Sequence, residues 1–123
     1  MLLELNEDQR LWRDTVHDVL AKECPATLVR TIAEAKPGQG ADPAAELWRS
    51  YVAMGWTEFT DATEMVELGL LIEELGRSSD PTPLLATMTQ FNALVPAAAD
   101  PKLTGAAVYE GVTAARTADG WLL

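Results

Sequence analysis

The residues that decide the fold run from Asp61 to Pro96, DATEMVELGLLIEELGRSSDPTPLLATMTQFNALVP. This pattern predicts two helices joined by a short loop. Asp61 and Glu64 have the spacing of a capping box, in which each side chain satisfies an unpaired backbone N–H of the first helical turn. Gly76 is placed to end the first helix, because glycine adopts the left-handed conformation after a helix without steric cost. The apolar residues at helical spacing, which we expect to face inward, are Met65, Leu68, Leu71, Ile72 and Leu75.

The second predicted helix covers Leu84 to Val95 and contains no charged residue. Pro83 suits its first turn, where a missing N–H costs nothing. Because a helix without a charged face is usually surrounded by protein, we expect it to be the central post of the fold. It carries two amide side chains, Gln90 and Asn92. A buried amide needs hydrogen-bond partners, so Asn92 is either a structural tie or part of a cavity lining.

The other elements follow from similar patterns. Helices are predicted over residues 6–22, 26–35 and 43–55, and an extended segment over 57–60. The first helix has Asn6 as its N-cap with Gln9 at the capping-box position, and its inward face carries Trp12, Val16, Val19 and Leu20, with Leu11 at the edge. Asp42 followed by Pro43 marks the start of the third helix. Short strands are predicted over 106–110, 112–116 and 121–123, with a hairpin turn at Asp119–Gly120. The fold class is therefore mainly α, a helical bundle with a few β-strands at the C-terminal end. We divide it into a helical domain over 1–100 and the start of a β-domain over 101–123.

Three places suggest that polypeptide is missing. The junctions at Thr60–Asp61 and Lys102–Leu103 leave little room for a loop, and the final strand would have an unpaired apolar edge. We expect absent segments at both junctions and a C-terminus that is a cut.

Charge and composition exclude several classes of function. The chain has 123 residues, with nine basic against nineteen acidic side chains and a formal charge of −10. This balance disfavours binding to nucleic acid or to an anionic membrane, since both depend on Lys and Arg. The single cysteine excludes an internal disulfide and a multi-cysteine metal site. With no secretory signal and no run of about 20 apolar residues, we expect a cytoplasmic protein.

Few residues could carry chemistry. His17 has only Asp14 and Asp18 nearby in sequence, so we interpret it as a solvated surface residue. Cys24 lacks an activating base and is interpreted as a half-buried small residue. Glu73 and Glu74 are adjacent on a helix and point about 100° apart, so they do not form an acid–base dyad. We expect one to face solvent and the other a basic group or a helix end. No catalytic or metal-ligating residue is predicted.

Five segments together resemble one enzyme family. They are Asn6–Val16, Leu47–Trp56, Glu67–Arg77 (ELGLLIEELGR), Pro83–Thr87 and Val112–Leu123. The chain resembles the N-terminal helical domain of the acyl-CoA dehydrogenase family, followed by the first strands of that family's middle β-domain. The E-E-L-G-R segment is the most specific match. The sequence departs from the family pattern at the two abrupt junctions, where a loop and a flavin-contacting strand are absent.

This resemblance implies an oxidoreductase, a flavoprotein that uses FAD to dehydrogenate an acyl-CoA thioester between its α and β carbons in fatty acid or steroid degradation. It implies a homo- or heterotetramer of such subunits. The family's catalytic base and most FAD contacts lie in domains with no counterpart in these 123 residues. By the same resemblance Leu85, Met88, Thr89 and Asn92 would lie on or near the wall of the acyl-chain pocket.

Two alternatives remain open. Asn92 departs from what a straight fatty chain requires, because such a chain gives an amide no partner. This favours a substrate with polar or ring features, or a noncatalytic partner subunit of a heteromeric acyl-CoA dehydrogenase that acts on sterol-derived CoA esters. The second alternative is a flavin-free helical interaction module.

Overall fold

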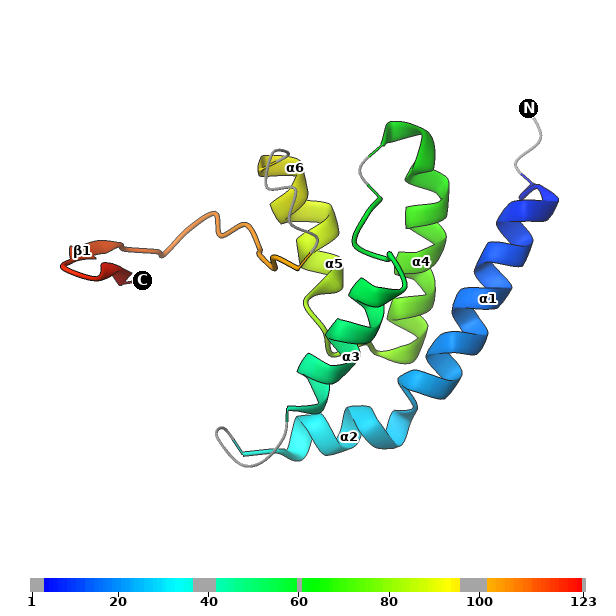
Figure 1. Ribbon diagram of the computed structural model, residues 1–123, viewed down its shortest axis with the longest axis horizontal. Coiled ribbons are helices and arrows are strands. Elements are labelled where there is room, and N and C mark those ends of the chain that lie inside the picture. Colours follow the sequence, from blue (N-terminus) through cyan, green and yellow to red (C-terminus); the bar gives the residue numbers. More distant parts are fainter. Residues whose placement is uncertain (1–3, 37–41, 60, 96–101, 123) are drawn as a thin grey trace.

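The fold is mainly helical, as the sequence predicts. The computed structural model describes residues 4–36, 42–59, 61–95 and 102–122. Its four long helices are α1 (Glu7–Glu23), α2 (Ala26–Glu34), α3 (Pro43–Ala53) and α4 (Met65–Ser78). Helix α1 packs chiefly against α4, and α2 turns away from the end of α1 and runs beneath α3 (Figure 1).

Helix α1 forms nearly as predicted. The backbone N–H of Gln9 donates to Oδ1 of Asn6 at 2.8 Å, and the N–H of Asn6 donates to Oε1 of Gln9 at 3.1 Å. This reciprocal pair is a capping box, so both ends of the predicted box are satisfied. The inward face is anchored by Val16 and Leu20, which are buried against the other helices. Leu11, predicted at the edge of this face, is exposed.

Helix α4 is the central element, but both of its ends differ from the prediction. Asp61 caps a separate 3₁₀ turn, η1 (Ala62–Glu64), by accepting a hydrogen bond from the N–H of Thr63 at 2.7 Å. The helix itself begins at Met65, which is exposed rather than inward. It also continues through Gly76, so the prediction that this glycine ends it is wrong. Leu68, Leu71 and Leu75 are buried as predicted, and Ile72 is partly buried.

The true end of α4 is set by Ser79, which takes the left-handed conformation with φ 55°. The N–H of Asp80 donates to the carbonyl of Leu75 at 3.0 Å, and that of Ser79 to Gly76 at 3.2 Å. These bonds close a Schellman-type cap, which satisfies the last carbonyls of the helix.

The second predicted helix is present but is not the central post. It runs as α5 (Leu84–Ala86), a π-helical turn η2 (Thr87–Phe91) and α6 (Asn92–Leu94). Leu84, Thr87 and Met88 are buried, but the opposite side is open to solvent, with Leu85 at 51% exposure. The prediction failed because small and hydroxyl side chains can face water without being charged.

Aromatic side chains close the end of the bundle. Trp56 is buried, stacks on Tyr51 with ring centroids 4.8 Å apart, and meets Trp12 edge to face at 6.4 Å. Gly55, at φ 76°, reverses the chain after α3. Thr57 therefore lies in a turn and residues 58–59 are irregular, so the predicted extended segment is wrong there; Thr60 lies outside the described residues.

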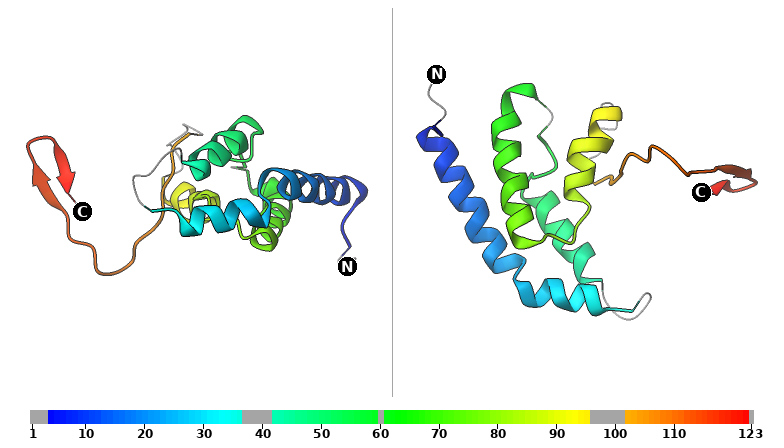
Figure 2. Two further views of the ribbon diagram at one scale, coloured as in Figure 1. Left: turned by 90° about the horizontal axis from the view of Figure 1, so that it is seen from below. Right: turned by 180° about the vertical axis from the view of Figure 1, so that it is seen from behind.

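The C-terminal residues form an extended arm that stands away from the helices (Figures 1 and 2). Its only described strands are β1 (Ala115–Thr117) and β2 (Gly120–Leu122), paired antiparallel with Arg116 opposite Trp121. The hairpin is confirmed, with its turn one residue earlier than predicted, at 118–119. The strand predicted over 106–110 is wrong, because described residues 102–114 have no partner strand. Leu123 and Pro101 lie outside the described residues.

Candidate functional site

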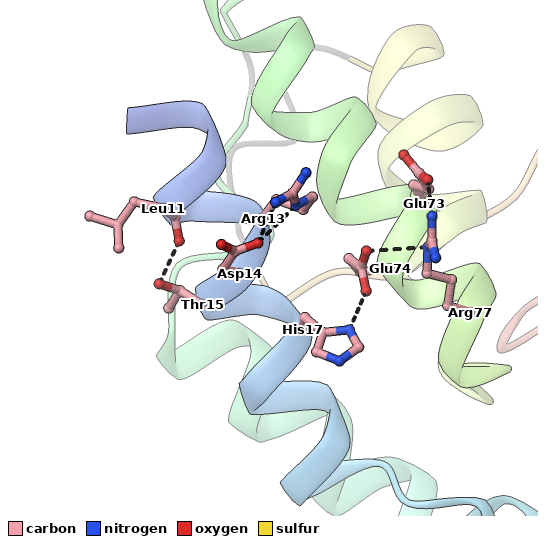
Figure 3. Close-up of polar contacts among 8 residues, drawn as sticks. All are labelled: Leu11, Arg13, Asp14, Thr15, His17, Glu73, Glu74 and Arg77. Carbon is pink, nitrogen blue, oxygen red and sulfur yellow. Dashed lines mark hydrogen bonds and ion pairs between the residues drawn. The ribbon is translucent and has the colours of Figure 1, made fainter. Parts of the chain in front are cut away.

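The acidic pair on α4 is the best-defined polar cluster in the helical body (Figure 3). Glu74 accepts from two directions: Nδ1 of His17, on α1, is 2.8 Å from one carboxylate oxygen, and Nε of Arg77 is 3.3 Å from the other. Glu73 points outward and pairs with the same arginine one turn later. The cluster therefore ties α1 to α4.

Glu74 and its two partners, His17 and Arg77, differ strongly in solvent exposure. The Glu74 side chain is 5% exposed, whereas those of His17 and Arg77 are 63% and 62% exposed. The hydrogen bond that Arg77 donates to Glu73, followed by the charges of both glutamates, raises the pKa of Arg77 above its ordinary value. Because His17 contacts one oxygen of Glu74 and Arg77 the other, its carboxylate is occupied as a structural acceptor. This confirms the prediction that one glutamate faces solvent and the other a basic group.

His17 is exposed as predicted, but sequence reasoning missed its partner. The nearby Asp14 bonds to Arg13 at 2.7 Å instead. The sequence did contain a hint of this contact. His17 directly follows the buried Val16, and a side chain at the edge of the inward face of α1 can reach the next helix.

A second polar cluster, partly buried, lies beneath the end of α4. The hydroxyl of Tyr51 donates to Oδ1 of Asp80 at 3.1 Å, and that of Thr82 donates to Oδ2 at 2.6 Å. Burial raises the pKa of Asp80 despite these bonds. Cys24 is 2% exposed, more buried than predicted, and burial followed by the charge of Asp80 raises its pKa. A thiol with a raised pKa is a poor nucleophile, so this cluster stabilises the core and offers no catalytic group.

The four residues assigned to an acyl-pocket wall are divided between two sides of the second helix. Leu85 and Thr89 are exposed, and the Thr89 hydroxyl donates to the Leu85 carbonyl at 2.7 Å. Asn92, one turn further along, is partly exposed, and its Nδ2 donates to Sδ of Met88 at 3.3 Å. Met88 itself is 5% exposed and belongs to the core. The structure thus brings Leu85, Thr89 and Asn92 to the open side and places Met88 beneath them.

The same helix holds the start of the C-terminal arm, which sequence reasoning did not foresee. The N–H of Gly105 donates to Oγ1 of Thr87 at 3.3 Å, and the N–H of Ala107 donates to Oε1 of Gln90 at 3.1 Å. Gly105 is required here, because a Cβ built on it would lie 2.1 Å from the ring of Phe91. The sequence feature that could have predicted this contact is the presence of Thr87 and Gln90 on a helix without charged residues, because polar side chains there need hydrogen-bond partners.

Across 4–36, 42–59, 61–95 and 102–122, no three His, Cys, Asp or Glu side chains are grouped to hold a metal ion. In the same ranges no helix has both the length and the apolar character needed to cross a bilayer.

Comparisons of the chain with protein-family models, with curated proteins and with solved structures found no match.

Proposed function

We propose that this chain is a subunit of an FAD-dependent acyl-CoA dehydrogenase, and that its second helix, α5 to α6, forms one wall of the acyl-chain pocket. The proposal rests on the segments that resemble that family. Two structural features support it. The segment Glu67–Arg77 lies within a single central helix, and helices are followed by a short β-hairpin, which is the order that the resemblance implies.

The observation that carries the proposal is the uncharged open stripe on this helix. Leu85 and Thr89 are exposed neighbours, because the Thr89 hydroxyl bonds the Leu85 carbonyl, and Asn92 is partly exposed one turn further along. Leu85 is half exposed, and the Thr89 hydroxyl is already bonded to backbone. In a chain of charge −10, an uncharged stripe suits an acyl chain better than a charged ligand.

The described residues do not themselves fit FAD. Its pyrophosphate requires free cationic or backbone donors, commonly from a glycine-rich loop before a helix. Arg10, Arg13 and Arg77 are each paired with a carboxylate of this chain. Arg30 has no such partner among the described residues, but it is the one unpaired arginine or lysine that lines the groove between α1, α2 and α4, and a single cation does not make a pyrophosphate site. We therefore assign this chain no step of the flavin chemistry. Its contribution is to bind and orient the acyl chain and to exclude water from it.

Glu73 and Glu74 of α4 are not assigned a part in the reaction. Removal of the α-proton requires a carboxylate that is free to accept it. Glu74 is buried and held by His17 and Arg77, and Glu73 is paired with Arg77. The resemblance implies that this base lies in domains with no counterpart in these 123 residues.

One observation favours the heteromeric alternative with a sterol-derived substrate. Among the described residues, the amide of Asn92 bonds only the thioether sulfur of Met88, which is a weak acceptor. An amide on the open stripe can bond a polar or ring-substituted acyl group. In that alternative the chain is the noncatalytic partner of a subunit that holds the flavin.

The test uses the protein isolated from its natural cells with any subunits that co-purify. We expect a visible flavin spectrum that bleaches when an acyl-CoA is added. Comparing the bleaching by a sterol side-chain CoA thioester with that by a straight-chain CoA thioester then shows which of the two substrate classes the protein uses. Leu85→Trp should raise the KM for the acyl-CoA, whereas Leu11→Trp, at a similarly exposed leucine on α1, should not. A preparation without flavin and without acyl-CoA binding would overturn the proposal and favour a helical interaction module.

A further inference from the structure

A groove lies between the C-terminal half of α1, helix α2 and the end of α4, and has a volume of about 680 Å³. That volume is in the range of sites for small molecules, roughly 300–1,000 Å³. No residue of the acyl-pocket stripe lines it.

The groove has an apolar floor and small walls. Leu20 and Cys24 are buried at its base. Ala21 of α1 and Ala26, Val29 and Ala33 of α2 form its sides. Three alanines leave space that larger side chains would fill, so an apolar ligand body of modest size can lie between these helices.

The charged residues around the groove are mainly basic, although the whole chain is acidic. His17, Arg30 and Arg77 line it, with Glu74 as the only acidic lining residue. Glu74 is already held by His17 and Arg77. Arg30 is exposed, and no ion pair or hydrogen bond engages its side chain within the described part of the chain. The groove therefore offers one uncommitted guanidinium beside an apolar surface.

We propose that this groove binds a small organic carboxylate, with its apolar body between α1 and α2 and its carboxylate on Arg30. A guanidinium presents paired N–H donors that match a carboxylate, and its bond to a carboxylate is charge-assisted. The apolar floor supplies the remaining contact. The imidazole of His17, fixed at Nδ1 by Glu74, lies at the same groove and limits where the anion can sit.

The test is an amide NMR titration of the full chain with three probes: hexanoate, hexylamine and inorganic phosphate. We expect hexanoate to shift the resonances of Ala21, Ala26 and Ala33 saturably. Arg30→Gln should weaken hexanoate binding about tenfold, since a charge-assisted bond is lost. Arg49→Gln, a matched control at an exposed arginine of α3 outside the groove, should leave it unchanged.

A second variant separates the apolar contact from the charge. Ala26→Trp, at an exposed position of α2, fills the groove without entering the core and should abolish the hexanoate shifts. The proposal is overturned if hexylamine binds as well as hexanoate, if phosphate binds as tightly, or if Arg30→Gln binds hexanoate normally while its other resonances remain native.

Discussion

Replacing His17 by alanine tests whether the buried Glu74 carboxylate depends on its exposed partners. The change removes the 2.8 Å contact to Nδ1 and leaves Glu74, at 5% exposure, with only the 3.3 Å contact to Arg77. A buried acceptor that loses a partner incurs its desolvation cost. We therefore expect His17→Ala to destabilise the fold even though its own ring is mostly exposed.

The expected magnitude follows from the two exposures. A hydrogen bond to a charged group contributes about 1.5–3 kcal/mol when both partners are buried. The His17 ring is 63% exposed, so solvent screening reduces this to about 1–2 kcal/mol. Glu74→Leu should lower the free energy of unfolding by less than His17→Ala does. Leucine has a similar volume and removes the buried charge, whereas His17→Ala leaves that charge with one partner fewer.

The assay is urea unfolding followed by circular dichroism, with the midpoint compared at constant slope. Asp18→Ala, at the adjacent exposed position of α1, is the control and should change stability by less than about 0.5 kcal/mol. In the background of Glu74→Leu, His17→Ala should become nearly neutral. Equal effects of His17→Ala with and without Glu74 would refute the coupling between α1 and α4.

Three further substitutions test other parts of the structure. Asp80→Asn should keep the hydrogen bond from Tyr51 and flatten the pH dependence of stability. Burial raises the pKa of Asp80 in the folded protein above its ordinary 3.8, so the folded state holds this proton to a higher pH than the unfolded state does. The wild type therefore loses stability as pH rises from 3.8 through the raised pKa, and the variant should not. Urea midpoints measured across pH check this, and an unchanged slope would contradict it. Gly76→Ala should stabilise α4 by about 0.5–1 kcal/mol in thermal or urea unfolding, because its Cβ would meet nothing within 4 Å inside a helix; destabilisation would mean that the helix ends there after all. Gly105→Ala should release the arm, seen as faster hydrogen exchange at the Ala107 amide, because its Cβ would collide with Phe91; unchanged exchange would rule out this docking.

Local signals in the sequence were sufficient for the helices. The capping box at Asn6 and the inward pair Val16 and Leu20 were predicted because capping and helical spacing involve residues three or four positions apart. Helix α3 was likewise marked by Asp42, whose carboxylate accepts from the N–H groups of Ala44 and Ala45.

Features that depend on distant residues were not predictable in the same way. The left-handed Ser79, not Gly76, closes α4, because the chain must turn there to place Asp80 beneath Tyr51. The pairing of His17 with Glu74 joins residues 57 positions apart, and no local pattern specifies it. The open side of the second helix was mistaken for a buried one, since absence of charge does not distinguish a buried face from a binding face.

The placement of the acyl chain against the second helix can be tested by photolabelling. An acyl-CoA with a diazirine near the end of its acyl chain is bound to the protein isolated with its co-purifying subunits, irradiated, and the labelled peptide is identified by mass spectrometry. We predict labelling at Leu85, Thr89 or Asn92, competed by unlabelled acyl-CoA and lost in Leu85→Trp. Competable labelling confined to other helices, or none in this chain while the flavin of the preparation is bleached, would contradict the assignment of this helix to the pocket wall.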